Sequence, residues 1–306
     1  MIKEPLFFIP IYKSIIWGGD KIKKELNRKI DLNIIGESWE LSAHKNDISI
    51  LSNNKNINLL DLFNNKEIKE DIFGTKCNNL DKFPLLIKFI DANSNLSIQV
   101  HPDDNYAKIN ENDSGKNEVW YVMDCNNDTN IIYGLNDKAK GISNKEIVNN
   151  ITNYINYEPI KKGDLISIPA GTIHSILSGT FICEIQQSSD ITYRVYDWNR
   201  GRELHIDKAI DVINPNTNKK IINCNNIEGN IYSSNNFNVD MININSSNKF
   251  ISSKESFTVY IVVEGSGIIE SNNYQKKLEK GSLFLIPSNL GEYNLSGNMR
   301  LLKVYL

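Results

Sequence analysis

Four polar side chains from three predicted elements could together hold a divalent metal ion. Gln99 and His101 are two residues apart, Glu118 begins the next predicted strand, and His174 follows the turn Pro169–Gly171. Two imidazoles, a carboxylate and an amide oxygen can bind an ion such as Zn²⁺ and leave positions open for a substrate. On spacing alone, the alternative is a set of ordinary hydrogen-bonded residues at the mouth of a β-barrel.

A strand with regular alternation must position the first two of these side chains. In the segment 96–101, of sequence LSIQVH, the apolar residues occupy one face, and Gln99 and His101 share the other. Glu118 lies on the same side of its own predicted strand as Trp120. We therefore expect the polar face of the first strand and the start of the second to point at a common site.

Most of the chain has the pattern of an all-β protein. Short apolar runs alternate with turns rich in Gly, Pro, Asn and Asp, as in a β-sandwich or barrel. Helices are expected to be few and short. The segments with helical signals are Asp20–Asn27, Asn58–Phe73 in two pieces, Asp103–Asn112, Ser143–Tyr154 with Ser143 as N-cap, and Ile206–Ile213 closed by Pro215.

A weak internal repeat links the two parts of the chain. Lys162–Pro169 (KGDLISIP) is similar to Lys280–Pro287 (KGSLFLIP), and upstream Trp120–Met123 is similar to Tyr260–Val263. Each block has the pattern of a strand, a turn that contains Gly, and a strand that ends in Pro. We infer two related β-barrels.

The repeat predicts a catalytic, metal-binding domain at 1–205 and a second barrel at 206–306. In this alignment, His174 of the first copy falls on Glu292 of the second, and no histidine follows His205. If the chain has a metal site, only the first barrel can hold it.

The charge balance excludes some classes of partner. The chain of 306 residues has 34 Lys and Arg residues against 37 Asp and Glu residues, a formal net charge of −3, without long blocks of one sign. No overall positive field attracts nucleic acid or an anionic membrane, so we expect neither as a partner. The length suggests roughly two domains at about 150 residues each. The oligomeric state is left open.

The cysteines and the first residues of the chain both favour a cytoplasmic protein. The N-terminal apolar stretches are broken by Pro5 and Pro10, so they form neither a signal peptide nor a membrane span. No CxxC motif occurs, which favours buried, reduced thiols. The cysteines are far apart in sequence, at Cys77, Cys125, Cys183 and Cys224.

Other chemistry-bearing residues fit less specific roles. His44 and His205 lie outside the strand pattern, so we expect them to be structural. The glycine-containing segments 17–19 (WGG) and 265–267 (GSG) form neither a P-loop nor a complete dinucleotide-binding motif. No Ser or Cys lies in a recognisable nucleophile elbow.

Seven segments of the chain are similar to motifs of one known family. They are Trp17–Gly19, Gly36–His44, Pro84–Asp91, Leu96–Asp104, Gly115–Val122, Ile168–Ile176 and Tyr193–Arg200. Together they resemble type I mannose-6-phosphate isomerases, in particular the short bacterial form of this branch of the cupin superfamily. The resemblance is dense over 1–205 and thinner beyond. It implies an all-β protein with a few short helices and two cupin-type jelly-roll β-barrels, the second of them degenerate.

The resemblance also implies a ligand set for one Zn²⁺ per chain. By match to the family's motifs, His101, Glu118, His174 and Gln99 are the metal ligands. The Gln99 amide could instead support the ligands from behind, because short members of the family are often described with two histidines and one glutamate.

Further site residues follow from the same resemblance. Arg194 matches the family's catalytic arginine, and Glu184 matches a carboxylate that lines the pocket in longer relatives. Lys116 and Lys88 are expected to contact sugar or phosphate oxygens, with a solvated lysine as the alternative for each. Trp17 is expected to form an apolar wall of the pocket, with a buried core aromatic as the alternative.

The implied reaction is the interconversion of mannose 6-phosphate and fructose 6-phosphate through an enediol(ate). Glu184 is expected to transfer the proton, with a hydroxide on the metal as the alternative base. Arg194 is expected to stabilise the enediolate or hold the substrate anion. Two other functions remain open at this point: an Fe²⁺-dependent cupin oxygenase, and a sugar-phosphate-binding protein that has lost isomerase activity.

Overall fold

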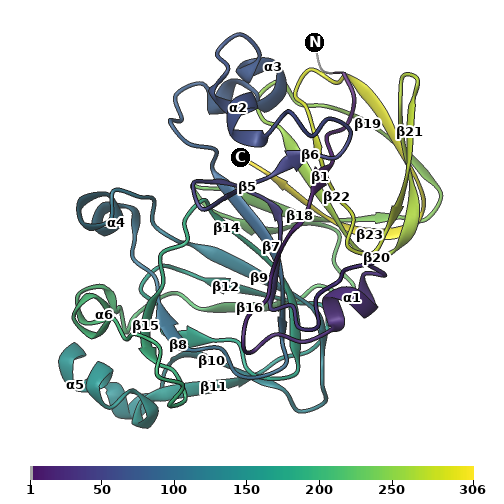
Figure 1. Ribbon diagram of the computed structural model, residues 1–306. Coiled ribbons are helices and arrows are strands. Elements are labelled where there is room, and N and C mark those ends of the chain that lie inside the picture. Colours follow the sequence, from purple (N-terminus) through teal and green to yellow (C-terminus); the bar gives the residue numbers. More distant parts are fainter. Residues whose placement is uncertain (1–2) are drawn as a thin grey trace.

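Strands dominate the computed structural model, which describes residues 3–306 (Figure 1). Two sheets form the larger part of the molecule. The strands of the first, in spatial order, are β16 (Lys220–Asn223), β12 (Asp164–Ile168), β9 (Glu118–Cys125), β14 (Thr180–Gln187), β7 (Leu85–Ala92), β3 (Glu37–Leu41) and β2 (Ile11–Lys13). Those of the second are β11 (Ile155–Pro159), β10 (Asn130–Leu135), β13 (His174–Ser175), β8 (Ile98–Val100) and β15 (Tyr193–Tyr196).

A third sheet forms the C-terminal part, shown in green and yellow in Figure 1. Its main path is β17 (Gly229–Ser233), β18 (Asn238–Ile244), β23 (Glu292–Tyr305), β20 (Thr258–Ser271) and β21 (Tyr274–Glu279). β19 (Ser247–Ile251) pairs with β23, and β22 (Leu283–Ile286) pairs with β20. Two small ribbons join β1 (Phe8–Ile9) to β6 (Ile50–Leu51) and β4 (Ala43–His44) to β5 (Asp47–Ile48).

The prediction of a mostly β protein with a few short helices is confirmed. The helices are α1 (Lys21–Glu25), α2 (Leu59–Asn64), α3 (Lys69–Phe73), α4 (Asp104–Asn110), α5 (Asn144–Asn149) and α6 (Ile206–Val212). Short 3₁₀ turns lie at Thr75–Cys77, Asp137–Ala139 and Ile151–Asn153. Ser143 caps α5 as predicted, because its side chain accepts a hydrogen bond from the Glu146 amide.

The expectation of closed barrels needs correction, because the strand pairings of the described residues form open sheets. The two sheets of the N-terminal part are instead held face to face by apolar side chains. Trp120 and Ile166, from β9 and β12 of the first sheet, share a cluster with Ile131 and Tyr133 from β10 of the second sheet. The site described below lies between these two sheets.

The other face of the first sheet, which contains β9 and β14, packs on the C-terminal sheet. Val119 and Ile185 belong to the same buried cluster as Val259 and Leu302. The alternation within each strand therefore sends one set of side chains toward the site and the other toward the neighbouring sheet. The boundary predicted after residue 205 stays a prediction; β16 lies beyond it and pairs with β12.

The two copies of the sequence repeat pair their strands in the same register. Trp120 lies opposite Ile166 in the first copy, and Tyr260 lies opposite Phe284 in the second. Inside the C-terminal part, the Tyr260 hydroxyl lies 2.9 Å from that of Tyr293 within an apolar cluster. Aromatic side chains thus fill the interior of the second copy.

Phe257 joins the two parts of the protein. Its ring contacts Phe73 and Phe83, with centroids 5.9 and 5.3 Å away, and it is fully buried. We expect Phe257→Ala to lower the free energy of unfolding by about 3–5 kcal/mol, because it removes a large side chain and leaves a cavity. Denaturant unfolding will measure this; Ile251→Ala, at a site 71% exposed, is the control and should change it by less than about 0.5 kcal/mol. Equal effects of both changes would contradict this packing.

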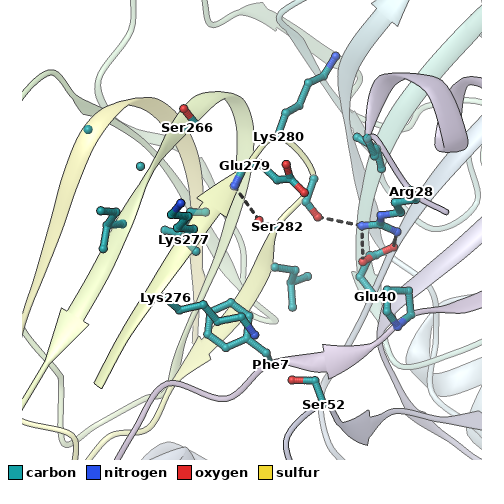
Figure 2. A pocket seen from close by; sticks show the side chains of 18 of the residues that line it. Phe7, Arg28, Glu40, Ser52, Ser266, Lys276, Lys277, Glu279, Lys280 and Ser282 are labelled. Atoms are coloured by element: carbon teal, nitrogen blue, oxygen red, sulfur yellow. Dashed lines mark hydrogen bonds and ion pairs between the residues drawn. The ribbon is translucent and has the colours of Figure 1, made fainter. Parts of the chain in front are cut away.

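A cavity of about 920 Å³ lies between the N-terminal residues and the C-terminal sheet (Figure 2). Arg28 lines this cavity and links its two sides. Its Nη1 lies 2.6 Å from Glu40 Oε1, and its Nη2 donates to the Gly281 carbonyl at 2.9 Å. None of the predicted site residues lines this cavity. It is separate from the site below.

Candidate metal centre

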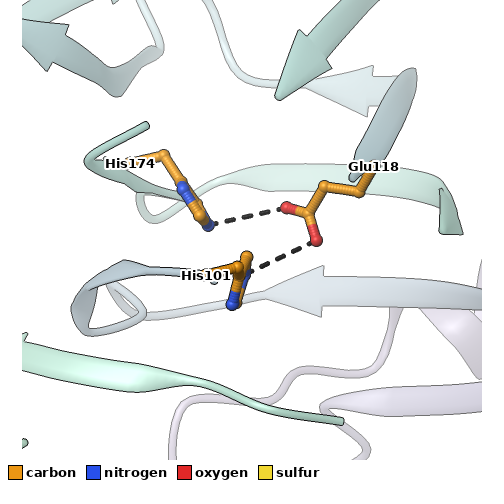
Figure 3. Close-up of side chains that lie close together, drawn as sticks. All are labelled: His101, Glu118 and His174. Atoms are coloured by element: carbon orange, nitrogen blue, oxygen red, sulfur yellow. Dashed lines mark ion pairs between the residues drawn. The ribbon is translucent and has the colours of Figure 1, made fainter. Parts of the chain in front are cut away.

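Three buried side chains converge between the two N-terminal sheets (Figure 3). His101 follows β8, Glu118 begins β9, and His174 begins β13. One ligand atom from each lies within 4.8 Å of the others. The Nε2 atoms of the two histidines each lie 3.5 Å from a carboxylate oxygen of Glu118. The sequence placed these residue types on separate elements, and the fold brings them together.

Backbone carbonyls fix the tautomers of both histidines. His101 Nδ1 lies 2.8 Å from the Ile191 oxygen, and His174 Nδ1 lies 2.9 Å from the Thr172 oxygen. A carbonyl only accepts hydrogen bonds, so each Nδ1 carries the proton and each Nε2 keeps a lone pair that can accept a hydrogen bond or bind a metal. Burial lowers the pKa of His101 well below its usual value and that of His174 to about 4. Both imidazoles are neutral, as metal ligands must be.

Glu118 is a fully buried carboxylate with a cation beside it. Lys116 Nζ lies 2.8 Å from its Oε2 as an ion-pair partner. Burial, partly offset by the charge of Lys116, raises the pKa of Glu118 to about 7. A divalent ion at the two Nε2 atoms would favour the ionised carboxylate. The two imidazoles and the carboxylate therefore fit such an ion.

Gln99 and Arg194 lie beside His174 on neighbouring strands. Gln99 is opposite His174 in one direction and opposite Arg194 in the other, so all three side chains point the same way. Gln99 Nε2 lies 3.3 Å from His174 Nε2, while its Oε1 accepts from Ser97 Oγ. Gln99 as a ligand stays a prediction, because its amide nitrogen faces the cluster. Arg194 Nη1 donates to the Glu203 carbonyl, and its buried Nε has no partner.

A row of charged and aromatic side chains runs across the first sheet, which faces the strands that carry Gln99, His174 and Arg194. Trp120, Glu184, Lys88 and Trp39 are successive cross-strand neighbours on β9, β14, β7 and β3. Trp120 Nε1 donates to Glu184 Oε1 at 3.1 Å, and Lys88 Nζ lies 3.5 Å from Glu184 Oε2. Glu184 thus faces the same space as Glu118, whose Oε1 accepts from the same indole at 3.0 Å.

The charges of this row set its protonation. Burial alone would raise the pKa of Glu184, but the charges of Lys116 and Lys88 outweigh it and hold that pKa below its usual value. Burial alone would lower the pKa of Lys88, but Glu37 and Glu184 outweigh it and raise that pKa. Glu184 is therefore an ionised carboxylate and Lys88 a cation at neutral pH.

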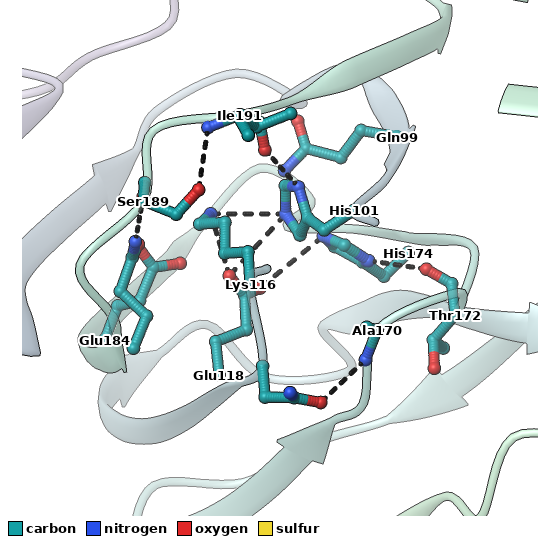
Figure 4. Close-up of polar contacts among 12 residues, drawn as sticks. Gln99, His101, Lys116, Glu118, Ala170, Thr172, His174, Glu184, Ser189 and Ile191 are labelled. Carbon is teal, nitrogen blue, oxygen red and sulfur yellow. Dashed lines mark hydrogen bonds and ion pairs between the residues drawn. The ribbon is translucent and has the colours of Figure 1, made fainter. Parts of the chain in front are cut away.

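Both lysines expected in the site are buried. Lys116 Nζ lies 3.2 Å from His101 Nε2 and pairs with Glu118 (Figure 4). Lys88 Nζ lies 4.8 Å from the centre of the Trp39 ring. The alternative of a solvated lysine is wrong for both. Their contacts with a substrate stay predictions.

Trp17 lies in the apolar cluster between the sheets, 3% exposed. This agrees with the alternative of a core aromatic, and its role as a pocket wall stays a prediction that the burial does not favour. His44 pairs with Asp113, and His205 Nδ1 accepts from the Arg194 amide. Neither histidine joins the cluster of three.

Sequence reasoning missed two features of the site. Glu37 accepts a hydrogen bond from Trp39 Nε1 at 2.6 Å and lies 3.8 Å from Lys88 Nζ. The alternation of the segment ESWEL could have placed Glu37 and Trp39 on one face. The second feature is that Arg200 and Arg202 both pair with one buried carboxylate, that of Asp197. The short segment that holds Arg194, Arg200 and Arg202 could have suggested this cluster. Burial and the charges of Arg202 and Arg200 lower the pKa of Arg194.

The fold and the buried His/Glu/His set define the class as a metal-dependent enzyme of the cupin type. The catalytic domain of type I phosphomannose isomerase matches residues 6–138, and the cupin domain of mannose-6-phosphate isomerase matches residues 228–306. Two relatives come from Bacillus subtilis: probable mannose-6-phosphate isomerase GmuF is 37% identical over 96% of each chain, and mannose-6-phosphate isomerase ManA is 36% identical over 97% of each.

A solved structure gives the same relation. The crystal structure of mannose 6-phosphate isomerase from Bacillus subtilis superposes with a TM-score of 0.86 at 32% identity, and the match covers 99% of each chain. The chain belongs to the mannose-6-phosphate isomerase family. The resemblance read from the sequence is confirmed.

Proposed function

We propose that the protein is a metal-dependent isomerase that interconverts mannose 6-phosphate and fructose 6-phosphate. The observation that carries the proposal is the buried cluster of His101, Glu118 and His174, whose two unprotonated Nε2 atoms and carboxylate lie within 4.8 Å of one another. The cluster belongs to a chain whose relatives over nearly its full length carry this enzyme's name.

His101, Glu118 and His174 would hold one ion per chain, with Gln99 as the fourth ligand. Two imidazoles and one carboxylate suit Zn²⁺, the metal we propose. When bound, the ion supplies Lewis-acid polarisation of the sugar oxygens next to the reacting carbons.

Glu184 is the group we propose for proton transfer. Isomerisation removes the proton from C2 of the open-chain mannose 6-phosphate and returns a proton to C1, while a hydroxyl proton moves from O2 to O1. Glu184 is ionised, buried, and held by Trp120 and Lys88. A carboxylate in this state can take the C2 proton and give it back on the same face of the enediol.

Arg194 and its neighbours supply positive charge for the substrate anion. An arginine keeps its proton at neutral pH, so Arg194 stabilises the enediolate or holds the phosphate rather than acting as a base. Arg200 and Arg202 share the carboxylate of Asp197, and Glu203 also lies near Arg194, so the three arginines exceed the two carboxylates by one charge. A protein with a net charge of −3 needs such a local cluster to attract a sugar phosphate.

Lys116 and Lys88 are proposed to contact the sugar from opposite sides of Glu184. Each is a buried cation whose partners are site carboxylates, Glu118 for Lys116 and Glu184 for Lys88. Such cations can donate to hydroxyl or phosphate oxygens. Family membership disfavours both the oxygenase and the pure binding protein.

We also propose a cytoplasmic location. The four cysteines are free thiols, three of them buried. Within residues 3–306, no helix combines the length and apolar character that a membrane crossing requires.

A coupled assay tests the function directly. Purified protein loaded with Zn²⁺ should convert mannose 6-phosphate to fructose 6-phosphate, whose formation is followed through a coupled dehydrogenase. Glucose 6-phosphate, the C2 epimer, and unphosphorylated mannose serve as comparison substrates. The absence of turnover with mannose 6-phosphate, in protein shown to contain metal, would favour the binding protein instead.

A further inference from the structure

Asn117 lies between two site residues yet faces away from them. It follows Lys116 and precedes Glu118, so the alternation of an extended chain turns its side chain to the opposite side. There its Oδ1 accepts a hydrogen bond from the Ala170 amide at 3.0 Å. Ala170 lies on the turn that leads through Thr172 to His174 (Figure 4). One side chain thus links the strand of Glu118 to the turn of His174.

The other end of the Asn117 amide is held by Gln187, the last residue of β14. The Asn117 backbone amide and its Nδ2 both donate to Gln187 Oε1, at 2.9 and 2.7 Å. Gln187 Nε2 in turn donates to Asp104 Oδ1 at 3.0 Å. Asp104 begins the helix that follows His101, and its Oδ1 also accepts from the Gly115 amide at 2.9 Å.

Only one orientation of these amides satisfies every partner. The Asp104 carboxylate accepts hydrogen bonds, so the Gln187 nitrogen must face it and the Gln187 oxygen must face Asn117. Asn117 must then present its nitrogen to Gln187 and its oxygen to the Ala170 N–H. Because donors and acceptors alternate along the whole chain of bonds, the chain from Asp104 to Ala170 has a fixed direction. It ties together the segments that carry His101, Glu118 and His174.

We propose that the Asp104–Gln187–Asn117 chain sets the affinity of the metal site, with Asn117 as a positioning residue. Asn117 contacts neither the ion nor the substrate in this account. It holds the turn before His174 at a fixed distance from Glu118, so that the imidazole and the carboxylate need little rearrangement to bind an ion. This inference rests on the proposed function, since it assumes the same three ligands.

The test is the affinity for Zn²⁺ alone, measured by competition with a chromogenic chelator and without substrate. Groups that orient metal ligands from behind typically contribute about 10–100-fold to affinity. Asn117→Ala should therefore raise the dissociation constant for Zn²⁺ by about that factor. At saturating Zn²⁺, kcat should recover and the KM for mannose 6-phosphate should stay near that of the unchanged protein.

Asn136 offers a matched control at a distance from the ligands. Its side chain also makes three hydrogen bonds, with the Lys138 amide and the carbonyls of Asn153 and Ile155. Asn136→Ala should lower the melting temperature of the metal-free protein about as much as Asn117→Ala does. It should leave the Zn²⁺ dissociation constant unchanged.

Gln187→Met is the second variant, in case Asn117→Ala does not fold. It keeps the Asn117 to Ala170 bond and removes the group that orients Asn117, so a smaller rise in the dissociation constant is expected. An unchanged dissociation constant in the folded variants, or an equal rise in Asn136→Ala, overturns the inference while the proposed function stands. If the unchanged protein binds no Zn²⁺, both fail together.

Discussion

His174→Ala should lose both bound metal and isomerase activity. The change removes one of the two imidazole nitrogens beside Glu118, and it leaves one imidazole, one carboxylate and the weakly binding amide proposed as the fourth ligand. Lewis-acid stabilisation of a developing oxyanion contributes several kcal/mol, so kcat/KM should fall by roughly a thousandfold or more. Metal content by elemental analysis and the coupled assay measure the two effects on the same preparation.

His44→Ala is the matched control for this prediction. His44 is also buried, but it pairs with Asp113 and lies outside the cluster. The His44 variant should retain one metal ion per chain. Loss of metal from the His44 variant but not from the His174 variant would place the site elsewhere.

Glu184→Gln should lower kcat by about 10²–10⁴-fold while the protein keeps its metal. Glutamine has nearly the same shape and can still accept the hydrogen bond from Trp120, but it cannot take the C2 proton. Lys88 keeps Glu37 as a partner, at 3.8 Å, so the row of side chains should stay folded. Exchange of the C2 proton with solvent deuterium should slow in parallel with turnover.

Glu158→Gln serves as the comparison, because Glu158 lies on β11 at the far edge of the other sheet. Its kcat should match that of the unchanged protein. If Glu184→Gln turns over at the normal rate, another group carries the proton. That result would favour the alternative base, a hydroxide on the metal.

Local pattern was enough to predict half of the site. The two-residue spacing of Gln99 and His101 on an alternating strand, and the turn before His174, depend only on residues close together in the sequence. The N-cap at Ser143 is likewise a local signal, and the structure bears it out. Glu118 joined the set as a carboxylate at the start of the next predicted strand, and the family motifs then gave all four residues the role of metal ligands.

The row of Glu184, Lys88 and Trp39 was beyond such reasoning. Its members come from three strands, and they meet only through the pairing register of β14, β7 and β3. Register is set by packing over the whole sheet rather than by any one segment. The burial of Lys88 and Lys116 was missed for the same reason, because a lysine is normally exposed unless the fold supplies its partners.

The repeat shows both the reach and the limit of sequence comparison. The aligned residues Trp120 and Tyr260 lie opposite the aligned residues Ile166 and Phe284, so the two copies are alike in strand pairing as well as in sequence. The alignment did not reveal that the sheets stay open, because closure depends on pairing around the whole sheet rather than on two of its strands.

A metal titration of the metal-free protein tests most directly whether isomerisation depends on a metal at this site. Zn²⁺ is removed with a chelator, its absence is verified by elemental analysis, and Zn²⁺ is then added stepwise while fructose 6-phosphate formation is followed. We predict no turnover without metal and full recovery at one equivalent per chain. Undiminished turnover by verified metal-free protein would contradict it.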